Sequence, residues 1–93
     1  MITLILILLP GCGYPEVSEK TYEITKALYS ACNRQSDVQL AKIELIISNA
    51  REANEISAKE AKWLDQILMS AQEGDWESAT AESRKLMEDQ IEY

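Results

Sequence analysis

Apolar residues recur at helical spacing in four segments of the chain after residue 16. Spacings of three, four and seven place them on one face of a helix in each segment, which predicts amphipathic helices. The expected helices begin near 17–18, 36–37, 57 and 75, and the first three end near 34, 54 and 73. Short connections favour antiparallel neighbours. The sequence therefore predicts an all-α fold, a small antiparallel bundle of about four helices within a domain spanning residues 17–93.

Each expected helix has a residue suited to its start. The N-cap candidates are Ser18, Ser36 or Asp37, Ser57 and Asp75. Ser57 and Glu60 also have the spacing of a capping box, in which each side chain accepts from the other residue's amide. Gly74 suits the end of the third helix because glycine tolerates the left-handed conformation. The break at 33–37 contains no glycine or proline, so a merged or kinked pair of helices remains an alternative there.

The apolar stripes also predict which side chains form the core. The run Leu45-Ile46-Ile47 is the most apolar point after residue 16, and we expect it at the centre of the core. The residues predicted to form the central core are Ile46, Ile47, Leu64, Leu68 and Leu86.

A different pattern precedes these helices: an uninterrupted apolar run from Ile2 to Leu9, followed by Pro10-Gly11-Cys12. As a helix this run would cover roughly 12 Å, against about 30 Å for the hydrocarbon core of a membrane. It is too short to span a bilayer but fits the apolar segment of a secretory signal.

The segment Leu9-Pro10-Gly11-Cys12 resembles the lipobox of a bacterial lipoprotein signal peptide, with Leu9, Gly11 and Cys12 at matching positions. The resemblance implies that residues 1–11 are a cleaved signal peptide and that Cys12 carries lipid, palmitate included. Residues 12–16 would then be a short tether to the helical domain. It also implies a cell-envelope location, and Gly13 implies the outer membrane if the cell has two. An ordinary cleaved signal and a non-exported apolar tail are the alternatives.

The net charge of the chain limits the classes of molecule that it can bind. All charged residues follow Cys12 and give a net charge of −7. Such a surface disfavours nucleic acid and anionic lipid, because both carry negative charge. We therefore expect membrane attachment through the lipid anchor and no nucleic-acid partner.

The chain is rich in carboxylates but lacks the histidines and cysteine pairs that metal and catalytic sites commonly combine with them. The chain has no histidine and no CxxC spacing, so neither a metal nor another cofactor is expected. No nucleophile motif or glycine-rich phosphate loop accompanies the carboxylates, which predicts that the protein is not an enzyme. Cys32 is expected to be a small buried hydrophobe, and a Cys12–Cys32 disulfide is the alternative if Cys12 carries no lipid.

Residues 49–60 resemble a degenerate EF-hand loop, with Ile56, Ser57 and Glu60 at matching positions. Arg51 stands where that loop has an oxygen ligand. Calcium binding is therefore an alternative, and a capped turn between two helices explains the same residues.

Residues 60–91 resemble one tetratricopeptide-type hairpin, through Trp63, Gly74, Asp75 and Ala79. The resemblance occurs once, whereas such repeats need about three copies to form a solenoid. It implies a helical hairpin and a peptide-binding surface.

Taken together, these patterns predict a small membrane-anchored envelope lipoprotein that is a protein-interaction module without catalytic activity, with an unknown protein partner. A structural envelope protein that self-associates is the alternative. Trp63 and Trp76 are expected to seal the core, and a binding platform is their alternative role.

Overall fold

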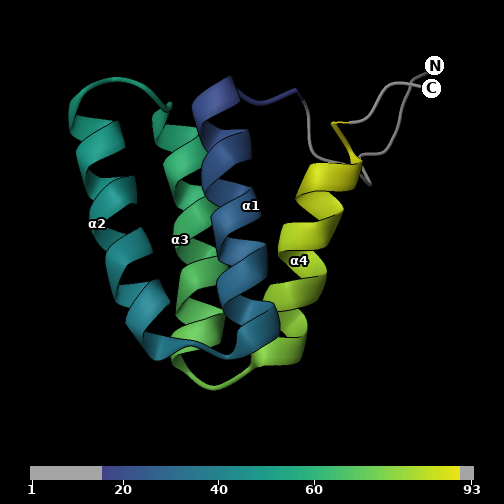
Figure 1. The fold of residues 1–93 in the computed structure, drawn as a ribbon. Coiled ribbons are helices and arrows are strands. Elements are labelled where there is room, and N and C mark those ends of the chain that lie inside the picture. Colours follow the sequence, from purple (N-terminus) through teal and green to yellow (C-terminus); the bar gives the residue numbers. More distant parts are fainter. Residues whose placement is uncertain (1–15, 91–93) are drawn as a thin grey trace, which may run out of the picture.

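Four antiparallel helices account for most of residues 16–90, the part of the chain that the structure, a computed structural model, describes (Figure 1). They are α1 (Glu19–Arg34), α2 (Asp37–Glu52), α3 (Ala58–Gln72) and α4 (Trp76–Glu88). The predicted all-α bundle is confirmed, and α2 ends two residues earlier than expected.

Side-chain caps fix where the helices begin. The N-cap residues are Ser18, Ser36, Ser57 and Asp75, and the side chain of each accepts a hydrogen bond from the backbone amide three residues later. Ser57 and Glu60 form the predicted capping box. Each cap satisfies an amide that the first turn of a helix leaves without a partner.

The break between α1 and α2 is a sharp turn, so the two helices neither merge nor kink. Gln35 adopts a left-handed backbone with φ of 53°. Its amide donates to the carbonyl of Cys32 at 3.1 Å, and the amide of Ser36 donates to that of Ala31 at 3.0 Å. These bonds satisfy carbonyls at the end of α1 and reverse the chain.

Two substitutions test the cost of left-handed backbone in opposite directions. Gln35→Gly should raise the free energy of unfolding by about 0.5–1 kcal/mol, because glycine avoids the Cβ strain at positive φ. Gly74 has φ of 93°, and a Cβ added there would meet no atom within 4 Å, so Gly74→Ala should cost about 1–2 kcal/mol through strain alone. Urea denaturation measures both, and a shift of the same sign in the two variants would contradict this account.

The core is a single cluster of aliphatic side chains contributed by all four helices. Its largest members, Leu28, Leu40, Leu64 and Leu86, are fully buried or nearly so. Ile47 and Leu68 are buried as well, so four of the five predicted core residues are confirmed.

The prediction for Ile46 and Leu45 is wrong: 42% of Ile46 and 66% of Leu45 are exposed. Consecutive residues of a helix point about 100° apart, so only one of three adjacent apolar residues can lie at the centre of the inner face. Ile47 takes that place together with Leu40 and Ile43. Helix α2 is therefore apolar on its outer side as well.

Helix α1 contacts all three other helices, whereas α2 and α4 do not contact each other (Figure 1). Small buried hydroxyl side chains occur on α1 and α4, and they bond to their own helices. Thr25 donates to the carbonyl of Thr21 at 2.7 Å, and Ser83 donates to that of Ala79 at 2.9 Å. These bonds allow polar residues to be buried without unpaired groups. Because α2 contacts only α1 and α3, it lies at one edge of the bundle.

Candidate functional site

The predicted lipidation site, Cys12, lies outside the described residues, as do residues 1–11 and most of the predicted tether at 12–16. The structure does describe the end of the bundle to which this segment connects. Helix α1 begins there and α4 ends there, beside the connection from α2 to α3 (Figure 1). We call this the Glu60 end, after the residue at its centre.

Glu60 joins the starts of two helices. One carboxylate oxygen accepts from the amide of Ser57, the N-cap of α3, at 2.8 Å. The other oxygen accepts from the amide of Ser18, the N-cap of α1, at 2.6 Å. The capping box was predicted, but the bond to Ser18, 42 residues away in the chain, was not. Glu60 therefore closes one helix start and attaches another to it.

The electrostatics of Glu60 follow from these bonds. Partial burial acts to raise the pKa of Glu60, and the hydrogen bonds from Ser18 and Ser57 act to lower it. The net result is a pKa below the ordinary glutamate value, because the hydrogen bonds together outweigh the desolvation. The ionised carboxylate is thus the form that the fold stabilises.

A second bond fixes the same end. The amide of Val17 donates to the side-chain oxygen of Gln90 at 3.0 Å, which connects the residue before the N-cap of α1 to the residues after α4. Val17 also packs against the core. The first described residues therefore run directly into the bundle rather than away from it.

The loop that resembles an EF-hand is a compact turn in the structure. The amide of Glu55 donates to the carbonyl of Ala50 at 2.8 Å, and Asn54 adopts a left-handed backbone with φ of 60°. A calcium ion at Glu60 would compete with the bonds from Ser18 and Ser57 for the same oxygens. Within residues 16–90 no three His, Cys, Asp or Glu side chains gather closely enough to hold a metal ion.

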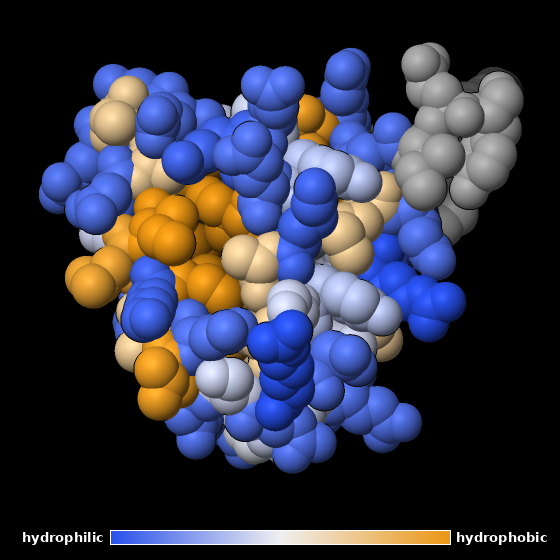
Figure 2. Space-filling view, in the orientation of Figure 1, coloured by the Kyte–Doolittle hydropathy of each residue, from blue (hydrophilic) through white to orange (hydrophobic). Residues whose placement is uncertain are grey.

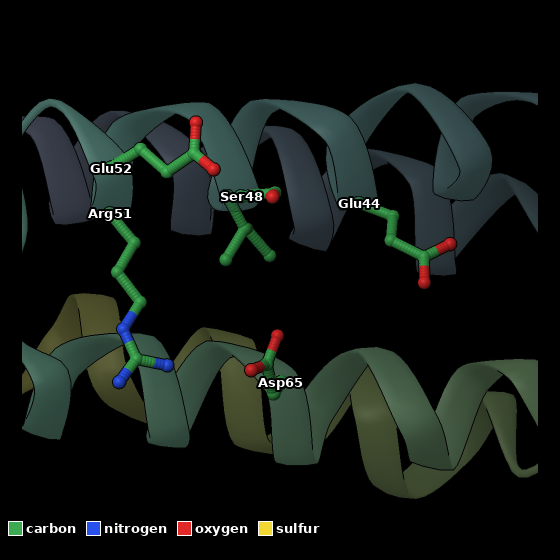
Figure 3. Close-up of a pocket in the computed structure, with 6 residues that line it drawn as sticks. Glu44, Ser48, Arg51, Glu52 and Asp65 are labelled. Atoms are coloured by element: carbon green, nitrogen blue, oxygen red, sulfur yellow. The ribbon is translucent and has the colours of Figure 1, made fainter.

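A groove of about 510 Å³ lies between α2 and α3 (Figure 3). It is lined by Glu44, Ile47, Ser48, Arg51, Glu52 and Asp65. Arg51 extends from α2 towards α3, and Asp65 points from α3 into the gap between the helices (Figure 3). Charges of both signs face this groove, and its lining holds no thiol or imidazole.

The most unusual surface lies on and beside α2. The exposed large apolar side chains of the described residues are Val38 (68% exposed), Leu45, Ile46 and Met69 (56% exposed). Figure 2 shows hydrophobic side chains gathered on the side of the molecule formed by α2 and its junction with α1. A smaller groove of about 200 Å³ at that junction is lined in part by Ile24, Ala27, Ile43 and Ile46. Contiguous exposed apolar surface is typical of protein-binding sites.

The two tryptophans and the second cysteine have structural positions. Trp63 and Trp76 are partly buried and pack against the core, as predicted for residues that seal it. The ammonium of Lys59 lies 5.7 Å from the centre of the Trp63 ring. Cys32 is buried as predicted, and burial raises the pKa of its thiol. A buried thiol of this kind is chemically inert.

Helices α3 and α4 form an antiparallel hairpin, as the resemblance to a tetratricopeptide unit implied. Peptide binding by that hairpin stays a prediction. No helix within residues 16–90 combines the length and the apolar character needed to cross a membrane. Comparison of the chain with protein-family models, curated proteins and solved structures found no match.

Proposed function

We propose that this protein is a small lipoprotein of the bacterial cell envelope, anchored through Cys12, whose helical bundle acts through protein contacts and not by catalysis. The apolar run from Ile2 to Leu9 and the lipobox-like Leu9-Pro10-Gly11-Cys12 support the anchor. The bundle supports the second half of the proposal.

The observation that carries the interaction role is the exposed apolar surface of α2. Val38 and Leu45 each leave about two thirds of their side chain in contact with water, although other leucines of similar size are fully buried in the same domain. Single exposed apolar residues are ordinary, but a group on one helix is typical of a contact surface. The two grooves described above, by contrast, are lined by neither histidine nor cysteine.

The hydrogen bonds at the Glu60 end support a close attachment to the membrane. Only Gly13 to Glu16 separate Cys12 from Val17, and four extended residues reach about 13 Å. Because Val17 and Ser18 are bonded into the bundle, the tether gains no further length by unwinding α1. In this proposal the Glu60 end faces the bilayer and the sides of the bundle remain accessible.

Replacement of the lipid acceptor tests the anchor. Cys12→Ser should leave an uncleaved precursor and abolish labelling by a fatty-acid probe in a bacterial host, because serine has no thiol to accept the lipid. Cys32→Ala is the matched control, since it removes the buried cysteine and should leave both labelling and cleavage intact. Labelling that persists in Cys12→Ser would contradict the proposal.

The interaction role has a separate test. The anchored chain is purified from membranes under mild conditions and compared with Leu45→Asp, which places a charge on the exposed surface of α2. A partner present in stoichiometric amount, whether another protein or a second copy of this chain, that accompanies the natural chain and is lost from Leu45→Asp supports the proposal. The same set of proteins with both chains would show that α2 is not the contact surface.

A further inference from the structure

The outer face of α2 has the pattern of a short helix–helix seam. Val38, Ala41 and Leu45 are exposed and follow one another at spacings of three and four, which places them along one line on the helix. This line lies opposite the inner face formed by Leu40, Ile43 and Ile47. We call these three residues the α2 seam.

The α2 seam is open because of where α2 sits. Helix α2 contacts α1 and α3 only, so no part of the described chain covers its outer side. In Figure 1, α2 and α4 lie on opposite sides of the bundle. The seam is therefore on a lateral surface, remote from the place where α4 ends.

Charges on either side of the seam are complementary to those of a second copy. Lys42 lies on the α1 side of α2, where it lines a groove with Ala27. Asp37 lies on the α3 side, one heptad before Glu44, which lines the groove towards α3. When two parallel helices pack along such a seam, a residue on one flank of the seam in the first copy lies beside a residue of the second copy. That second residue is five positions later in the sequence and lies on the opposite flank of its own seam. Asp37 of each copy then meets Lys42 of the other.

The parallel orientation of the two copies rests on the proposed anchor. Two copies tethered through Cys12 to one bilayer have their Glu60 ends on the same side, so their α2 helices run in the same direction. A two-fold axis along the helices brings Val38 to Val38 and Leu45 to Leu45 across the seam. One heptad after Leu45, Glu52 of one copy would face Glu52 of the other. Because two carboxylates repel each other, the seam is limited to residues before Glu52.

We infer that the partner of the α2 seam is a second copy of this chain, packed in parallel with Asp37–Lys42 pairs on both sides. The seam from Val38 to Leu45 is about 10 Å long, so the pairing is weak in dilute solution. Confinement of both copies to one membrane raises their effective concentration and favours the pair.

Cysteine cross-linking in membranes tests the inference on the full chain. Leu45→Cys should form a disulfide-linked dimer when membranes are treated with a copper–phenanthroline oxidant, because the two-fold axis brings the new thiols together. Ala81→Cys, on the exposed surface of α4, is the matched control and should give at least about five times less dimer. Equal cross-linking at the two positions would overturn the inference.

A charge exchange tests the parallel register. In the Leu45→Cys background, Asp37→Lys or Lys42→Asp alone should reduce the dimer several-fold, because each places like charges across the seam. The double variant Asp37→Lys with Lys42→Asp should restore it, since the pairs re-form with reversed signs. Failure of the double variant to restore the dimer would overturn the parallel pairing.

The natural chain separates this inference from the proposed anchor. Cys32 is buried, so a disulfide dimer of the natural chain would have to involve Cys12. Such a dimer would contradict lipidation of Cys12. The α2 pairing is measured separately, as the amount of disulfide-linked dimer that Leu45→Cys forms in excess of the natural chain. This excess should fall and recover with the charge exchange.

Discussion

Leu64→Ala should lower the free energy of unfolding by about 2–5 kcal/mol, because truncation of a buried leucine removes apolar contacts and leaves a cavity. Leu64 is fully buried in the centre of the bundle. Small domains have only about 5–15 kcal/mol of stability, so this variant should approach unfolding at moderate temperature. Ile47→Ala should have an effect of similar size. Urea denaturation followed by circular dichroism measures both.

The chain offers matched controls for this prediction. Leu45→Ala removes the same atoms from a side chain that is two thirds exposed, and at low protein concentration it should cost under about 1 kcal/mol. Glu88→Ala breaks the exposed pair with Arg84, in which Nε and Oε2 lie 3.3 Å apart, and should also cost under about 1 kcal/mol. A loss from either control equal to that of Leu64→Ala would show that the surface, and not the core, determines stability.

Glu60→Ala should lower the free energy of unfolding by about 1–3 kcal/mol at pH 7, because it leaves the amides of Ser18 and Ser57 without their charged acceptor. Glu60→Gln should cost less, since its single carbonyl oxygen keeps one of the two bonds. Glu55→Gln is the control: it changes an exposed glutamate in the same loop and should have little effect.

The effect of Glu60 should depend on pH in a defined direction. The folded state lowers the pKa of Glu60, so its stabilising contribution is complete above the ordinary glutamate value of about 4.3. As the pH falls below that value the unfolded chain takes up the proton first, and the contribution disappears as the pH passes the lowered folded pKa. The difference between the natural chain and Glu60→Gln should therefore shrink as the pH falls below the ordinary glutamate value. A difference that stays constant over this fall in pH would contradict a charged cap.

Local signals were sufficient to predict the helices. Ser18, Ser36, Ser57 and Asp75 act through amides three residues away, so the sequence itself contains both partners of each cap. The spacing of apolar residues likewise predicted most of the core. The left-handed turn at Gln35 was not predicted, because glutamine carries no preference for that conformation.

The features that matter most for the candidate function depend on tertiary structure. The bond between Glu60 and Ser18 joins residues that periodicity alone cannot bring together. The exposed side of α2 was missed because apolar residues were assigned to the core, and only the edge position of α2 leaves Leu45 uncovered. The lipid anchor at Cys12 is a motif outside the described residues, and it remains a prediction.

The packing of α1 against α4 also determines when the fold can be completed. These are the first and last helices of the bundle, so α1 keeps an unburied side until α4 (Trp76–Glu88) has been made. Bringing together segments so far apart in sequence costs loop-closure entropy. The local contacts between neighbouring helices therefore form first, and the contact between α1 and α4 forms last. A chain released one residue at a time therefore remains incompletely folded until α4 emerges, a state compatible with threading through a narrow export channel. In the proposed envelope location, final closure would then take place on the far side of the membrane, where the proposed anchor would be attached.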